Sequence, residues 1–205
     1  MSVLLSSDVI RGLTLMCFKQ HSRRYTAADI EALTEGAVDR KMAENWHNRD
    51  LWLTPSESPP RGKPRLYSVA HLFEALTRAA LVEGGFTHAA ARTAIEFRLA
   101  EVALAKERQR GERGSATTPV YATAEEVAQE IYDLPELRQP KADWYWAIYF
   151  FYYDTKVSEL ARTIAFKGEM SAADLFNTYR VGTIVHISAI VRDVCAYVER
   201  GDRSD

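Results

Sequence analysis

Two groups of side chains in the first third of the sequence have the chemistry needed to bind nucleic acid. Arg40, Lys41 and Asn45 lie close together along the chain. A guanidinium or ammonium group can neutralise a phosphate, and a carboxamide can form the paired hydrogen bonds that adenine offers. The second group lies in a segment without acidic residues, and it consists of Arg61, Lys63 and Arg65. A flexible basic segment of this kind can reach phosphates or the minor groove.

None of the common catalytic motifs occurs in the sequence. A Gly-rich phosphate loop, a Gly-x-Ser-x-Gly elbow and a close pair of acids beside a nucleophile are all missing. No two histidines have the spacing of a metal-ligand pair, and Cys17 and Cys195 are too far apart for a Cys-x-x-Cys motif. We therefore expect a protein that is not an enzyme, that uses no cofactor or metal, and that works in a reducing cytoplasm.

The overall composition is that of a soluble globular protein with one large domain or two small ones. Of the 205 residues, 47% are hydrophobic and 26% are charged, which argues against a disordered, fibrous or disulfide-scaffold protein. The formal net charge is −2. Any binding to nucleic acid must therefore come from a local basic face.

Residues 9–18 form an apolar stretch near the N-terminus that is interrupted by Arg11. No segment of the chain approaches the roughly 20 continuous apolar residues that a bilayer requires. The stretch also has no basic region before it and no small-residue cleavage site after it. We predict that it is a short helix that packs on the core or on a partner chain, and we expect no membrane association.

The next segment has the layout of a helix-turn-helix. A first helix is predicted over residues 25–34, where Thr26 and Asp29 have the spacing of a capping box. Gly36 is expected to form the left-handed cap at its end. A second helix over about residues 39–48 follows after only a few residues. Two short helices joined by such a turn are typical of DNA-binding units.

A β-hairpin and two longer helices are predicted after these two helices. Short apolar pieces at residues 51–55 and 65–68 flank a stretch rich in Pro and Gly, which indicates a hairpin with a long flexible tip. The two further helices are expected over residues 69–82, capped by Ser68, and from residue 88 to about 106, capped by Thr87.

The ordered set of these elements resembles the MerR-type winged-helix family of DNA-binding domains over about residues 24–98. The resemblance rests on the first helix, a second helix ending in Asn45–Leu51, a wing closing on Arg65-Leu66-Tyr67-Ser68, and Gly85-Phe86-Thr87 opening the next helix. It implies that the second helix enters the major groove and that the wing contacts the DNA beside it. The DNA-binding residues expected from this arrangement are Arg40, Lys41, Asn45, Arg49, Arg61, Lys63, Arg65 and Tyr67.

Two acidic residues depart from the pattern of this family. Its members usually have Gly where Asp50 stands, and often a basic residue where Glu44 stands. Facing phosphates, these carboxylates would be repelled; facing base edges, Glu44 could accept a hydrogen bond from a cytosine amino group. Residues 24–67 hold seven basic and seven acidic side chains. DNA binding therefore requires that these charges are sorted onto different faces, while Trp46 is expected to pack in the core.

The second half of the chain is predicted to be a small α+β unit. Residues 106–118 are almost all charged or small and polar, and we interpret them as a linker. The domains expected are an N-terminal extension over 1–23, a winged-helix domain with its following helices over 24–105, and an α+β domain over 119–205. Strands are predicted within 144–153 and 181–188, and helices over 158–166 and 189–199.

An aromatic segment lies inside the first of these strands. Eight of the ten residues between Asp143 and Asp154 are aromatic, which favours a strand that is apolar on both faces, although a helix is the alternative. Trp144, Trp146 and Tyr149 could line a cavity for a flat apolar effector molecule. The other interpretation, which we favour, is a core strand or a subunit interface.

Together these observations predict a mainly α protein whose C-terminal part is α+β and whose N-terminal part is a winged helix-turn-helix. The function expected is a sequence-specific transcription regulator that binds double-stranded DNA as a homodimer, with dimerisation through the helix from residue 88, the back half, or both. One alternative is a phage-type recombination accessory or architectural protein that bends DNA. Another is a winged-helix module that binds proteins and no longer binds DNA.

Overall fold

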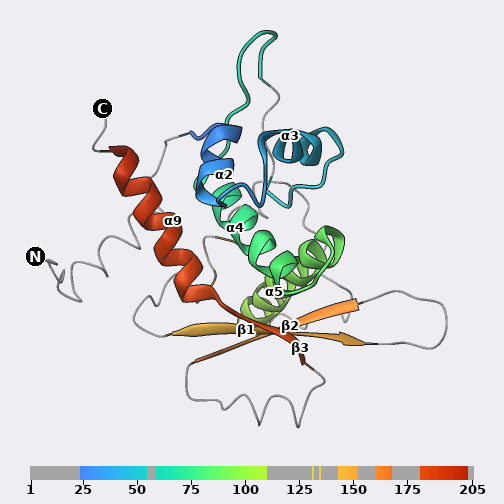
Figure 1. The fold of residues 1–205 in the computed structure, drawn as a ribbon. Coiled ribbons are helices and arrows are strands. Elements are labelled where there is room, and N and C mark those ends of the chain that lie inside the picture. Colours follow the sequence, from blue (N-terminus) through green and yellow to red (C-terminus); the bar gives the residue numbers. More distant parts are fainter. Residues whose placement is uncertain are drawn as a thin grey trace, which may run out of the picture.

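The structure is a computed structural model that describes residues 24–54, 59–109, 131, 134, 143–151, 160–167 and 181–202. Its elements along the chain are α2 (Ala27–Leu33), α3 (Arg40–Asn48), α4 (Val69–Glu83), α5 (His88–Gln109), β1 (Trp144–Phe151), β2 (Leu160–Lys167), β3 (Val181–His186) and α9 (Ile187–Asp202). The helices lie on one side of a small sheet, and α4 runs through their centre (Figure 1). The described part of the chain is thus mostly helical, with a small antiparallel sheet toward its C-terminal end.

The first two helices begin and end at local signals in the sequence. The capping box of α2 is confirmed, because the Thr26 amide donates to the Asp29 carboxylate at 2.6 Å and the Asp29 amide donates back to the Thr26 hydroxyl. The left-handed cap is displaced by one residue from the expectation. Glu35, with φ 51°, follows the C-cap residue Thr34, and Gly36 is also at positive φ. Asp39 is the N-cap of α3, and its carboxylate accepts from the Met42 amide at 2.6 Å.

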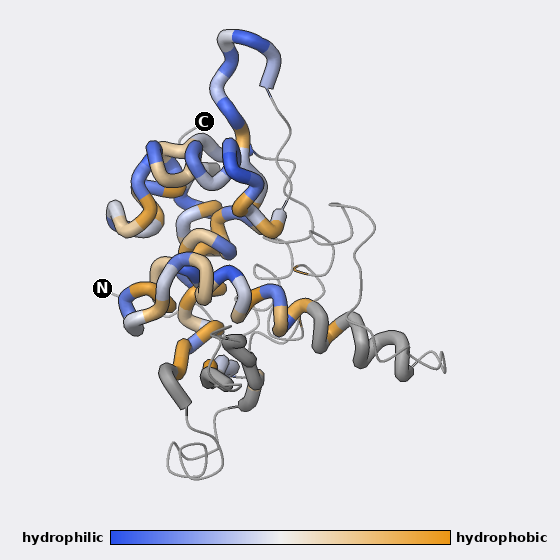
Figure 2. Tube along the Cα trace, turned by 90° about the vertical axis from the view of Figure 1, so that its right-hand side faces the viewer, coloured by the Kyte–Doolittle hydropathy of each residue, from blue (hydrophilic) through white to orange (hydrophobic). Residues whose placement is uncertain are grey.

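The expected β-hairpin is not present in residues 51–54 and 59–66, which contain no strand. Proline explains part of this, because Pro59, Pro60 and Pro64 have no amide hydrogen to give to a ladder. A turn closed by Lys63 N and Pro60 O at 3.0 Å forms the tip instead. We call residues 59–66 the 59–66 loop. It extends away from the helices (Figure 1) and is hydrophilic over most of its length (Figure 2).

The base of this loop is tied to the start of α2. Tyr67 and Tyr25 form an isolated antiparallel bridge in which each amide donates to the other carbonyl, at 2.7 and 2.8 Å. Ser68 precedes α4, and its amide donates to Nδ1 of His71 at 3.1 Å, an imidazole version of the capping box. The cap expected at α5 is confirmed, because the Thr87 hydroxyl accepts from the Ala90 amide at 3.2 Å.

The sheet has the order β2-β1-β3, and both pairings are antiparallel. The strands expected in the aromatic segment and at residues 181–188 are confirmed, as is the helix that follows the second of them. The helix expected over residues 158–166 is wrong, because residues 160–167 form β2. Strand β1 has backbone donors and acceptors along both edges, and the pairing with β2 satisfies one of these edges.

One hydrophobic core contains residues from both parts of the chain. Helix α9 lies against α4 and α2, and α5 packs on β2. The rings of Phe73 on α4 and Trp146 on β1 form a T-shaped pair, with 6.3 Å between the ring centres. The expected linker over 106–118 lies outside the described residues, apart from 106–109, which belong to α5. None of the described helices is long and apolar enough to cross a membrane.

Candidate nucleic-acid interface

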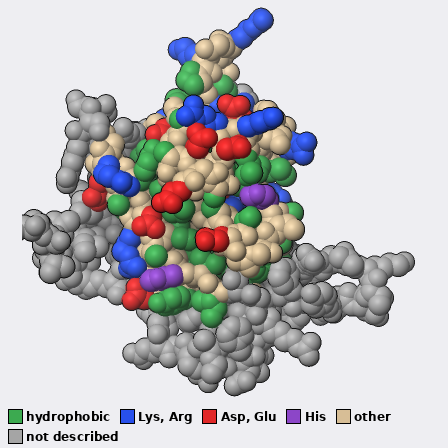
Figure 3. All heavy atoms as spheres, viewed as in Figure 1, with side chains coloured by type: hydrophobic (Ala, Val, Ile, Leu, Met, Phe, Trp, Pro, Cys, Tyr) green, Lys and Arg blue, Asp and Glu red, His purple; other side chains and the backbone are tan. Residues whose placement is uncertain are grey.

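The candidate interface is the side of α3 that faces away from the core, together with the 59–66 loop. We call this surface the α3–loop face. Ala43 and Trp46 hold α3 to the protein from its other side, and Trp46 is 4% exposed, as expected for a core residue. Six of the residues expected to bind DNA have exposed side chains, namely Arg40, Lys41, Asn45, Arg49, Arg61 and Lys63. Figure 3 shows basic side chains at the tip of the loop, with basic and acidic ones mixed below it.

Tyr67 does not belong to this surface. Its side chain is fully buried, so its hydroxyl cannot reach a phosphate. The expectation that Tyr67 binds DNA is therefore corrected. The ring packs against Trp52 and His71, with centroid distances of 5.6 and 5.4 Å. Burial raises the pKa of Tyr67, while the nearby charges of Arg65 and Glu44 act on it in opposite directions. Tyr67 therefore holds the base of the loop rather than the ligand.

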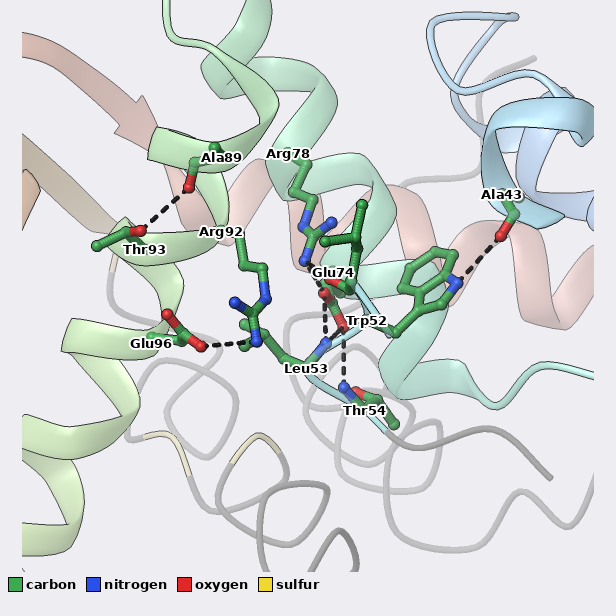
Figure 4. A network of polar contacts seen from close by, with 11 residues as sticks. Ala43, Trp52, Leu53, Thr54, Glu74, Arg78, Ala89, Arg92, Thr93 and Glu96 are labelled. Carbon is green, nitrogen blue, oxygen red and sulfur yellow. Dashed lines mark hydrogen bonds and ion pairs between the residues drawn. The ribbon is translucent and has the colours of Figure 1, made fainter. Parts of the chain in front are cut away.

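A buried ion pair fixes the segment that joins α3 to the loop. The Glu74 carboxylate lies 2.6 Å from the Arg78 guanidinium on α4, and both side chains are almost fully buried. Glu74 also accepts hydrogen bonds from the amides of Leu53 and Thr54, at 2.9 and 3.1 Å (Figure 4). Arg78 donates to the Leu51 carbonyl. One carboxylate and one guanidinium thus satisfy two amides and one carbonyl of residues 51–54.

The same guanidinium connects this segment to α3. The Arg78 side chain lies 4.4 Å from the centre of the Trp46 ring and 5.8 Å from that of Trp52. The Trp52 indole in turn donates to the Ala43 carbonyl at 3.2 Å, so it reaches back into α3. The position of α3 therefore depends on α4 through side chains that do not reach the surface.

Sequence reasoning missed this network, although a signal for it was present. Glu74 and Arg78 are four residues apart inside α4, which is otherwise strongly apolar. Opposite charges at this spacing lie on the same side of a helix. In an apolar helix the combination indicates a buried pair with further polar partners, because an unpaired buried charge is costly.

Acidic side chains around α2 are bonded to other groups of the protein. Asp29 caps α2 and also accepts a hydrogen bond from the Tyr197 hydroxyl of α9 at 2.9 Å. Glu31 pairs with Arg40 at 2.6 Å, which joins α2 to the first turn of α3. Asp39 caps α3. Arg40 is therefore the one candidate DNA contact that already has a carboxylate partner among the described residues.

The remaining basic residues of the α3–loop face differ from Arg40 in their contacts. Lys41, Arg49, Arg61 and Lys63 make no hydrogen bond or ion pair through their side chains in the part of the chain that the structure describes. Arg65 is half-buried, and its charge acts on both His47 and Tyr67. It therefore lies where the loop meets α3, and it is less accessible than the two cations at the tip.

Besides Asp39, which caps α3, two exposed acidic residues lie on or beside this face in the described part of the chain. Glu44 lies on the outer side of α3, and Asp50 follows the end of that helix. Burial and the charge of Arg65 lower the pKa of His47, while the Asp50 carboxylate raises it. Asp50 has a φ of 53°, and its amide donates to the His47 carbonyl at 3.0 Å. The backbone at this position is thus the left-handed kind that favours glycine.

The aromatic residues expected to bind an effector are partly described. Trp146 is fully buried and packs on Phe73, which agrees with a core strand. Trp144 is half-buried at the start of β1, where its amide donates to the Ser188 hydroxyl at 2.9 Å. The backbone of Tyr149 pairs with Arg162, and its side chain lies outside the described residues.

The described residues contain no group of three or more His, Cys, Asp or Glu side chains that could hold a metal ion. A comparison of the chain with protein-family models finds no match, and a comparison with the curated proteins finds none either.

Proposed function

We propose that this protein is a sequence-specific transcription regulator of the cytoplasm that binds double-stranded DNA through the α3–loop face. The observation that carries the proposal is the distribution of charge around α3. Lys41, Arg49, Arg61 and Lys63 are exposed without carboxylate partners in the described structure. Phosphates supply the negative charge that such a surface lacks, and they release counterions when they bind to it.

The fate of the acidic residues supports the same proposal. Residues 24–67 hold equal numbers of acidic and basic side chains, so DNA binding needs the acidic ones to be kept away from phosphates. Asp29, Glu31 and Asp39 meet this need in part, because their carboxylates are already bonded to donors of the protein itself. Of the acidic residues described on α3 and just after it, Glu44 and Asp50 are left.

Base reading is proposed for the middle of α3. Asn45 is exposed one turn after Lys41, and its carboxamide suits adenine. Glu44 is exposed beside it and suits the amino group of cytosine. The basic tip of the 59–66 loop, at Arg61 and Lys63, would bind the backbone next to the base contacts.

We further propose that the protein binds as a homodimer. A two-fold symmetric dimer recognises a palindromic site, because each half-site meets the same surface. Enrichment of direct repeats instead of a palindrome would favour an architectural or recombination accessory protein, which was the alternative with the same DNA-binding unit.

A second candidate function follows from Glu44, Asp50 and the Glu31–Arg40 ion pair. All three reduce the positive potential of the α3–loop face. If they dominate, the face serves as a contact surface for a protein rather than for DNA. The two functions are separated by salt, since only phosphate binding gives a steep loss of affinity for duplex DNA as salt rises.

The test is selection of bound sequences from a random duplex library at two salt concentrations, followed by titration of the best site. We expect an enriched palindrome. Replacing Arg61 and Lys63 together with Gln should weaken binding to every duplex and reduce the slope of log K against log salt by about two. The matched control replaces Arg192 and Arg200 on α9, which are also exposed, and should leave the slope unchanged.

A second variant tests base reading separately. Asn45→Ala should relax the preference at one base pair by about 1–3 kcal/mol while leaving the salt slope unchanged. No enrichment and no salt-sensitive retention of DNA would contradict the proposal and favour the protein-interaction function.

A further inference from the structure

A groove of about 990 Å³ runs between α2, α4 and α9, and it shares no residue with the α3–loop face. Its lining includes small and aliphatic side chains from all three helices and one tyrosine, among them Leu33, Leu76, Ala80, Val82, Ala196 and Tyr197. None of these six is fully buried, although each lies between helices that pack together. The groove therefore presents apolar surface that the described elements leave uncovered.

The rim of the groove is acidic. Glu35, Glu83 and Asp193 line it, one from each of the three walls, and all three are exposed. The C-terminal end of α4, at Glu83, adds the negative end of a helix dipole. Arg200 is the one basic residue among the described residues of the lining. It donates to the Ala196 carbonyl at 3.2 Å and lies 5.9 Å from the Tyr197 ring. The electrostatics thus favour a cationic occupant.

The walls are held in place before anything binds. Tyr197 on α9 donates to Asp29 on α2 at 2.9 Å, and its ring packs on Tyr25 with 6.5 Å between the centres. Helix α9 also packs along α4. A preformed groove lowers the ordering cost of binding.

We propose that this groove binds an amphipathic helix of a partner protein, whose apolar face is flanked by Lys and Arg side chains. The open trough between three helices suits a fourth helix better than a compact ligand, and the alanines of its lining allow helix axes to approach closely. Basic side chains of the incoming helix would reach Glu35, Glu83 and Asp193 on the rim. The proposal does not depend on DNA binding.

The test uses the full-length protein and a labelled 18-residue peptide of Leu and Lys, arranged with leucine on one helical face. Fluorescence anisotropy reports binding. We expect the peptide to bind, and we expect a peptide of the same composition in scrambled order, and one with Glu in place of Lys, to bind at least tenfold more weakly.

Matched variants locate the site. Asp193→Lys should weaken binding of the Leu/Lys peptide at least fivefold, whereas Glu199→Lys, on the same helix but outside the groove, should change it less than twofold. Ala80→Trp should fill the groove and block binding, and Ala89→Trp, at an exposed position of α5, should not. Circular dichroism confirms that each variant is folded.

Three results would overturn the proposal. Equal binding to the groove variants and their controls would place the peptide elsewhere. Self-association of the protein that Asp193→Lys abolishes would make the occupant a second copy. A tenfold gain in peptide affinity when Leu13 and Met16 are both replaced by Asp would make it the chain's own N-terminal residues.

Discussion

The hydroxyl group of Tyr197 donates a hydrogen bond to the carboxylate of Asp29 at 2.9 Å, across 168 residues of sequence. The same carboxylate accepts from the amide and the hydroxyl of Thr26 and so caps α2. A single side chain therefore sets the start of α2 and holds α9 beside it. The last described helix of the chain is therefore part of what positions α2.

This contact predicts a measurable coupling between α9 and α2. Tyr197→Phe removes the hydroxyl and keeps the ring, and it should lower the free energy of unfolding by about 1 kcal/mol, because a hydrogen bond to a charged group is lost at a partly buried site. Urea denaturation measures this loss. In an Asp29→Ala background the same substitution should cost almost nothing, and equal costs in both backgrounds would contradict the coupling.

The Glu74–Arg78 pair predicts a much larger effect. Arg78→Met leaves a buried carboxylate without its counter-charge and should cost about 3–5 kcal/mol of stability. Glu74→Gln leaves the guanidinium unpaired and should cost a similar amount. The double variant should cost clearly less than the sum, since the Gln oxygen can still accept from the Leu53 amide and no unpaired charge remains.

The control for this prediction is the second ion pair of Figure 4. Arg92 and Glu96 lie 2.9 Å apart on α5 at the same spacing of four residues, but both side chains are partly exposed. Arg92→Met should therefore cost less than about 1 kcal/mol. Similar losses for Arg78→Met and Arg92→Met in denaturation experiments would show that burial does not determine the cost.

His71 predicts a dependence of stability on pH. Burial lowers its pKa from 6.5 to about 3, and its Nδ1 accepts a hydrogen bond from Ser68 only when unprotonated. Because the folded pKa is the lower one, its stabilisation is complete above pH 6.5 and is lost as pH falls toward 3. This loss amounts to about 2 kcal/mol between pH 8 and pH 5.

The variant His71→Gln isolates this contribution. A Gln oxygen can accept from the Ser68 amide, as in an ordinary capping box, but it does not titrate. The free energy of unfolding of the variant should fall by about 2 kcal/mol less than that of the parent protein between pH 8 and pH 5. An identical fall in the two proteins would show that His71 is not the group responsible.

The elements that the sequence predicted correctly are those with local signals. Thr26 with Asp29 and Thr87 with Ala90 form caps that need only neighbouring residues. The strand β2 has no such local signal. Residues 160–167 become a strand by pairing with β1, and their own sequence does not show this pairing. The expected hairpin failed for the opposite reason, since an apolar pattern predicted pairing that the prolines cannot support.

In the candidate site too, the sequence predicted the features that depend on local residues and missed those that depend on tertiary contacts. Exposure of Arg61 and Lys63 follows from a hydrophilic, proline-rich stretch, and sequence reasoning placed both on the surface. The burial of Tyr67 and the engagement of Arg40 by Glu31 depend on how α2, α3 and the loop base meet. Such tertiary contacts cannot be read from one segment at a time.

Asp50 provides a prediction that separates backbone strain from charge. Its φ of 53° is costly for a side chain other than glycine, so Asp50→Gly should raise the free energy of unfolding by about 0.5–1 kcal/mol. It should also strengthen DNA binding about threefold, because a carboxylate beside the α3–loop face is removed. Asp50→Asn should give the same gain in affinity with little change in stability, since Asn removes the charge and tolerates the same backbone conformation.

Glu35 is the matched control, because it has a φ of 51° at the equivalent end of α2 and does not belong to the α3–loop face. Glu35→Gly should stabilise the protein by about as much as Asp50→Gly while leaving DNA affinity unchanged. Thermal melts and DNA titrations of the three variants measure both quantities. If all three changed DNA affinity equally, net charge alone would account for the effect, and the place of Asp50 beside the α3–loop face would be irrelevant to it.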